Sequence, residues 1–228
     1  MLPIRDDIPR FSCAPAVWVL IAANTLAFVA IVRTDPVDLE LFYALWGMMP
    51  ARFTNPNWAG IVGFPFSEYI TLVSALFLHA DALSFFFNLW ALWLFGPALE
   101  EELGFWGLLL VYALCGIAGW GGYIALEPES QLPAVGASGA IAGLIGAYAL
   151  RFPHARTLVF LPMLRFPPYG AVPASVFQLV WLACQLVLAA MSQHAESIAI
   201  TPGWTTLATA LAVGVLIQPL FARSRPQD

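Results

Sequence analysis

The stretch that decides the fold is VGASGAIAGLIGAY, residues 135–148, where Ser138 stands between glycines at the start of an apolar run. Gly139 and Gly143 form a G-x-x-x-G step, and small residues at this spacing let helices approach closely in lipid. The same G-x-S-G arrangement leaves room for a substrate backbone beside a serine nucleophile, with helix-start N–H groups available to an oxyanion. The stretch predicts a membrane helix and leaves packing and catalysis both open for Ser138.

The rest of the chain has the composition of a polytopic membrane protein. Of its 228 residues, 61% are hydrophobic and 10% are charged, and the mean hydropathy is +0.80, far from a soluble domain. The net charge of -5 gives no basic face, which excludes nucleic-acid binding. Three widely spaced cysteines in or beside apolar runs indicate neither a disulfide framework nor a metal site, and no cofactor is expected.

A requirement of roughly 20 apolar residues per crossing predicts six membrane helices. They are expected at residues 14–32, 82–99, 104–126, 133–150, 172–191 and 198–221. We therefore expect an all-α six-helix bundle forming one domain over residues 14–221, with an N-terminal tail of residues 1–13 and a C-terminal tail of residues 222–228. The connection at residues 33–78 is rich in Pro, Gly and aromatic residues and is expected to be a long interfacial loop.

The arginines predict the orientation of this bundle. Seven of the nine lie in the two tails and in the connection after the fourth span, and the chain has no lysine. By the positive-inside rule, both termini are expected in the cytoplasm. The fourth span then runs inward and places Ser138 near the outer surface, at a depth similar to that of Ser84, Asn88 and Gly203.

Several motifs together resemble one family. GASGAIAGLIGAY, followed by RFPHAR and VPA, resembles the fourth span and following loop of rhomboid intramembrane serine proteases. Upstream, WGMMPARF and FLHADALSFFFNLWALWLFGPALEEELG are similar to the family's first loop and second span, with its G-x-x-x-E-x-x-x-G pattern at Gly96, Glu100 and Gly104. The resemblance covers roughly residues 42–191. It implies a Ser/His dyad that cleaves transmembrane segments of membrane-protein substrates near the outer membrane face, with the bacterial inner membrane as the expected location.

The resemblance also assigns site residues. Ser138 matches the nucleophile, Gly136 a motif glycine and Asn88 an oxyanion donor. Two positions depart from the pattern: Ser84 stands where the family has a second oxyanion histidine, and Gly203 stands where it has the general-base histidine.

A hydroxyl is a weak nucleophile unless a base takes its proton, so a substitute base was sought among the three histidines. His154 lies about 24 Å beyond Ser138 along a straight helix, which is too far. His79 is expected to have a structural role before the second span. His194, in the fifth connection on the side of Ser138, is left as a possible substitute base. The glutamates at 100–102 are expected to form a solvated turn in which Glu100 caps the third span.

Three functions therefore compete on sequence grounds. The first is an intramembrane serine protease with an unusual base, and the second is a rhomboid-like pseudoprotease that binds transmembrane clients in the lipid bilayer without cutting them. The third, a small transporter, is disfavoured because the spans hold few charges. The incomplete dyad indicates that proteolysis is impaired or lost.

Overall fold

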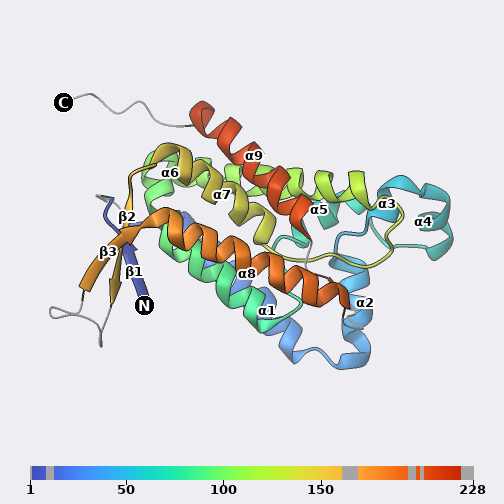
Figure 1. Cartoon of the computed structure of the whole chain (residues 1–228). Coiled ribbons are helices and arrows are strands. Elements are labelled where there is room, and N and C mark those ends of the chain that lie inside the picture. Colours follow the sequence, from blue (N-terminus) through green and yellow to red (C-terminus); the bar gives the residue numbers. More distant parts are fainter. Residues whose placement is uncertain (1, 9–12, 161–168, 195–198, 201–202, 222–228) are drawn as a thin grey trace.

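The computed structural model describes residues 2–8, 13–160, 169–194, 199–200 and 203–221, and these are mostly helical (Figure 1). In chain order the elements are β1 (Leu2–Asp6), α1 (Pro15–Arg33), α2 (Pro36–Trp46), α3 (Pro50–Thr54), α4 (Pro56–Val62), the 3-10 helix η1 (Glu68–Ile70), α5 (Thr71–Ser74), α6 (Ala82–Leu126), α7 (Ser138–Arg151), β2 (Arg156–Phe160), β3 (Tyr169–Pro173), α8 (Ala174–His194) and α9 (Trp204–Phe221). The C-terminal tail expected at residues 222–228 lies outside the described residues.

The 45 residues of α6 contain two of the expected spans, as two helices that meet at a kink. Gly104 interrupts the helix with a φ of 75°, a conformation that favours glycine because it has no Cβ. Figure 1 shows the two legs of α6 turning back on each other at this kink. The legs correspond to the spans expected at residues 82–99 and 104–126.

Three helices in the described part of the chain are long and apolar enough to cross a membrane. They are α1, α6 and residues Ala174–Ser192 of α8. Residues Trp204–Leu220 of α9 are apolar but form a shorter helix, and α7 has 14 residues. Helices therefore occupy the positions of all the expected spans, while their lengths alone do not establish six crossings.

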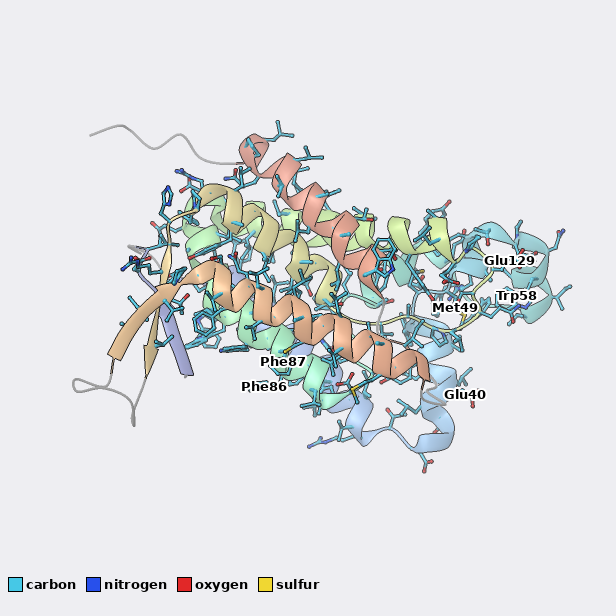
Figure 2. All side chains as sticks on the ribbon, in the orientation of Figure 1. Glu40, Met49, Trp58, Phe86, Phe87 and Glu129 are labelled. Carbon is cyan, nitrogen blue, oxygen red and sulfur yellow. The ribbon has the colours of Figure 1, made fainter. Side chains whose placement is uncertain are left out.

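The expected interfacial loop at residues 33–78 is largely helical. Proline stands in the first turn of α3 and α4, where its missing N–H costs no hydrogen bond. Asn55 caps α4 by accepting from the Trp58 N–H at 3.1 Å, and Gly63 ends it in the left-handed conformation. Figure 2 shows Met49, Trp58 and Glu129 together at the end of the molecule that carries these short helices.

The expectation of an all-α chain needs a correction at the opposite end of the bundle. There β1, β2 and β3 form an antiparallel sheet in that order, in which Asp6 pairs with Thr157 and Thr157 with Val172 (Figure 1). The residues expected to form an N-terminal tail thus begin with a strand. Strands of five residues beside apolar helices carry too little pattern to be distinguished from helix ends.

Small residues of the decisive stretch pack α7 closely between α6 and α9. A Cβ added at Gly146 would lie 2.5 Å from the Leu211 carbonyl oxygen, and one added at Gly143 would lie 3.0 Å from the Ala210 oxygen and would meet the Cys115 side chain. Helix α8 contacts its neighbours much less than α7 does. The core of the molecule is therefore the group of α6, α7 and α9.

Glu100 and Glu102 correct the expectation of a solvated turn. Both are buried, with exposed fractions of 5% and 1%. The two carboxylate oxygens of Glu100 accept from the N–H groups of Ala16 at 2.8 Å and Val17 at 2.9 Å, so Glu100 caps α1 rather than the third span. Glu102 pairs with Arg151 of α7 at 2.7 Å.

Candidate functional site

Ser138 is the first residue of α7 and is fully buried. Gly136, two residues earlier, has a φ of 139° and donates its N–H to the Ala75 carbonyl at 3.0 Å. The Val135 N–H donates to the Ile200 carbonyl, which joins the same segment to the residues before α9. The turn before α7 is thus held from both sides, and it fixes Ser138 at a helix start.

The start of α7 provides hydrogen-bond donors as well as the hydroxyl. The Ile141 N–H bonds back to the Ala137 carbonyl at 2.9 Å, so the N–H groups before it have no partner inside the helix. Such groups can stabilise a developing oxyanion. The Ser138 Oγ has no hydrogen-bond partner among the described residues, which leaves nothing there to take its proton.

Asn88 lies on the first leg of α6 in a buried polar network. Its side-chain amide donates to Ser84 Oγ at 3.4 Å and lies 3.3 Å from His79 Nε2. Its carbonyl oxygen accepts from Gln185 Nε2 of α8 at 2.9 Å. Asn88 and Ser84, which were assigned together from the sequence, are brought together, whereas no hydrogen bond joins either to Ser138 in the described part of the chain.

His79 is held in its neutral form by this environment. An amide NH2 group only donates, so Nε2 of His79 accepts from Asn88 and is unprotonated. Burial lowers the pKa of His79 from 6.5 to about 4. The structural role expected for His79 is consistent with these contacts.

Ser84 supports Asn88 rather than replacing a histidine. The Ser84 N–H is bound by the carboxylate of Asp81, the N-cap of α6, at 2.7 Å, and its hydroxyl meets the Asn88 amide. Asp81 therefore has a structural role at the start of α6.

Gly203 is half-buried and directly precedes α9, and it offers no group that could act as a base. Thr206, the third residue of α9, packs against glycines of α7 and α6. A Cβ added at Gly139 would lie 3.0 Å from the Thr206 methyl carbon, and one added at Gly119 would lie 2.8 Å from it. The Thr206 hydroxyl is buried without a partner among the described residues. The start of α9 thus packs a threonine methyl against α6 and α7.

Neither the other histidines nor the carboxylates that follow α6 bind the Ser138 hydroxyl in the part of the chain that the structure describes. His154 is exposed in the turn beyond the far end of α7, and Glu127 and Glu129 are exposed after α6. His194 is the last residue of α8, and its side chain lies outside the described residues. In the same described part, no group of three or more His, Cys, Asp or Glu side chains could hold a metal ion.

Sequence reasoning missed Gln185 and Thr206. Gln185 is an amide inside the apolar run of α8, and a polar residue in a membrane helix is a signal of an interhelical contact. Its partner Asn88 is 97 residues away in sequence, so only the fold reveals the pair.

Comparisons with known proteins agree with these motifs. The model of the rhomboid domain matches residues 67–224, well over half of the chain. The "Putative rhomboid protease YdcA" of Bacillus subtilis is 44% identical over 87 residues, which are 38% of this chain and 43% of that protein. "Rhomboid protein 1, mitochondrial" of Saccharomyces cerevisiae is 33% identical over 126 residues, 52% of this chain and 35% of the relative. The chain matches less than half the length of each of these curated relatives.

Proposed function

The chain belongs to the rhomboid family, and on that premise we propose that it binds transmembrane segments of other membrane proteins at the Ser138 site, with its proteolytic step impaired or lost. It is a multi-pass membrane protein, as its family and its long apolar helices indicate. The observation that carries the proposal is Gly203, a residue without a side chain at the position of the family's general base. Removing members of a catalytic triad leaves only residual catalysis.

The fate of the proton supports the proposal. For Ser138 to attack a peptide carbonyl, its proton must pass to a group within hydrogen-bond reach. Ser138 Oγ has no such partner among the described residues. His79 is occupied by Asn88, and its pKa of about 4 makes it a weak base at neutral pH.

The same scaffold supports retained binding of membrane segments. The turn at Gly136, the helix start at Ser138 and the polar network around Asn88 are ordered by buried hydrogen bonds that need no histidine at position 203. We infer a six-span topology with both termini in the cytoplasm, on the arginine distribution, and a bacterial inner membrane as the location.

The test of the lost proteolytic step is labelling of the purified protein with a serine-directed fluorophosphonate. We expect the natural chain to label no more than Ser138→Ala does. We expect Gly203→His, alone or with Ser84→His, to gain labelling and cleavage of a model transmembrane substrate. Gly60→His is a matched control, because position 60 in α4 is open and remote from the site.

Labelling of the natural chain that disappears in Ser138→Ala would sink the proposal of lost proteolysis. Loss of that labelling in His194→Ala would then identify the substitute base. The binding half is tested separately by photocrosslinking to a transmembrane peptide in bilayers. We expect the natural chain and Ser138→Ala to crosslink equally, and absence of crosslinking in both would contradict it.

A further inference from the structure

A cavity of about 330 Å³ lies between α7, α8 and α9, away from Ser138. Its first α7 residue is seven positions beyond Ser138, roughly 10 Å along the helix axis. The wall is almost wholly apolar and includes Gly146, Ala149, Gln178, Leu182, Leu211 and Val215. The small residues of α7 form the inner wall, so the space exists because α8 does not close on that face.

Gln178 is the unusual member of this wall. It is 8% exposed, and its amide makes no hydrogen bond with any described residue. Neither amide atom of Gln178 is among the fully buried side-chain atoms that lack a partner, so the amide is accessible at the surface of the wall. By contrast, Nε2 of Gln185 on the same helix donates to Asn88. The cavity therefore presents one unused polar group to whatever fills it.

The cavity opens on the outer side of α8. Leu179, which lines it, is 66% exposed, and Ser175, also in the wall, is exposed two residues after the end of β3. Ser175 and Gln178 are three positions apart and share a helix face. The polar groups thus lie at the end near the sheet, and the apolar wall extends from them along the membrane helices.

Size decides what can enter. A transmembrane helix needs about 20 residues, or about 30 Å, to cross a bilayer, whereas the cavity borders α7 only from Ile145 to Leu150, roughly 8 Å of helix, so it does not accommodate a whole transmembrane segment. It lies at the small end of ligand pockets, which are mostly apolar with a few polar groups that fix orientation. A single hydrocarbon chain with one polar group at its end matches both the volume and the polarity.

We propose that this cavity binds one acyl chain of a membrane glycerolipid, with the ester carbonyl accepting from the Gln178 amide. Ser175, at the mouth, faces the glycerol region, and the chain runs along Gly146 and Ala149 toward Leu211. The site is independent of Ser138 and of whether the protein cuts peptide bonds.

The test uses the full chain in nanodiscs of phosphatidylethanolamine, with a fraction of the lipid carrying a diazirine in one ester-linked acyl chain. After irradiation, adducts are mapped by mass spectrometry. We expect adducts concentrated on cavity residues such as Leu182 and Val215. Ala149→Phe places a ring at the open side of the cavity and should lower these adducts about tenfold, because the ring competes with the acyl chain for the space. Ala208→Phe, on an exposed position of α9 outside the cavity, should leave them unchanged.

Gln178→Leu keeps the shape and removes the amide, so it tests the ester contact without filling the cavity. We expect it to reduce cavity labelling by the ester-linked lipid severalfold and to leave labelling by an ether-linked analogue unchanged. Equal loss with both lipids, or no loss with either, would overturn the ester contact. Adducts spread evenly over all exposed helix faces and insensitive to Ala149→Phe would overturn the lipid site itself.

Discussion

Gly143 lies where there is no space for a side chain, so even the methyl group of alanine would clash with neighbouring atoms. The methyl group would meet the Cys115 side chain and lie 3.0 Å from the Ala210 carbonyl oxygen, so α6, α7 and α9 meet at one residue. We expect Gly143→Ala to lower the free energy of unfolding by about 1–3 kcal/mol, measured by denaturant unfolding in mild detergent. Gly121→Ala, in α6 with nothing within 4 Å, is the matched control and should be neutral or stabilising by up to about 1 kcal/mol. An equal loss in both variants would contradict the packing account.

His79 gives the stability of the protein a pH dependence. Its pKa is about 4 in the folded chain against an ordinary 6.5, so between these values the unfolded chain takes up a proton that the folded chain does not. Stability should be constant above pH 6.5 and fall as the pH drops toward 4, by up to about 3 kcal/mol. Unfolding curves at several pH values check this, and His79→Gln should flatten the dependence. A curve unchanged by that substitution would assign the effect to other groups.

Single residues also mark how far the sequence could predict the site. Ser138 at a helix start was predictable from the glycines around it, whereas Gly136, expected inside the span at residues 133–150, lies in the turn before α7. The bond from Gln185 to Asn88 was not, because it depends on where α8 crosses α6. Thr206 has no distinguishing pattern in the sequence, and only the structure shows that its methyl group packs against Gly119 and Gly139.

Among the elements, α8 is joined to the rest of the bundle by few polar contacts. Trp181 donates to the Phe87 carbonyl at 3.1 Å, and Gln185 donates to Asn88 at 2.9 Å. Figure 2 shows Phe87 and its neighbour Phe86 on the leg of α6 that passes beside α8. On its other side, α8 borders the cavity rather than a packed surface. Among the described residues, α8 is therefore held by these two interhelical bonds, by the sheet at its start and by the packing of Phe177 and Trp181 into the core.

Strand β1 is bound to α7, the helix that begins at Ser138, by a buried hydrogen bond. The Tyr148 hydroxyl of α7 donates to Asp6 Oδ2 at 2.9 Å, and both residues are buried. We expect Tyr148→Phe to lower the free energy of unfolding by about 0.5–1.5 kcal/mol, because the hydrogen bond to Asp6 Oδ2 is lost. Faster amide exchange at Thr157 and Leu158 would localise the change to the sheet. Tyr69→Phe, on a side chain that is 67% exposed, should have no effect, and equal losses in the two would contradict the assignment.

Elements were predicted with uneven success for physical reasons. Long apolar runs were located because each needs about 20 residues to cross a bilayer. The division of α6 into two legs was located as well, because Gly104 separates two apolar runs and breaks the helical conformation between them. The sheet was missed because β1 pairs with β2 about 150 positions away, a contact that no local pattern encodes.

For the whole molecule, the expected orientation can be tested on a natural thiol. Cys13 is exposed at the end of the bundle that begins α1, whereas Cys115 is buried. With the N-terminus in the cytoplasm, we expect a membrane-impermeant maleimide to label Cys13 in inside-out vesicles and not in right-side-out ones. Cys13→Ser should abolish the signal. Labelling only in right-side-out vesicles would reverse the orientation derived from the arginines.

The β1–β2 pairing also sets an order of events during synthesis. Leu2 pairs with Phe160 and Asp6 with Thr157, so β1 is made well before its partner and waits about 150 residues for it. At 5–20 residues per second, the delay is roughly 8–30 s. During that time α1, both legs of α6 and α7 are synthesised while β1 has no sheet to join. The sheet can therefore begin to close only after α7 is complete, and it can do so before α8 and α9 are made.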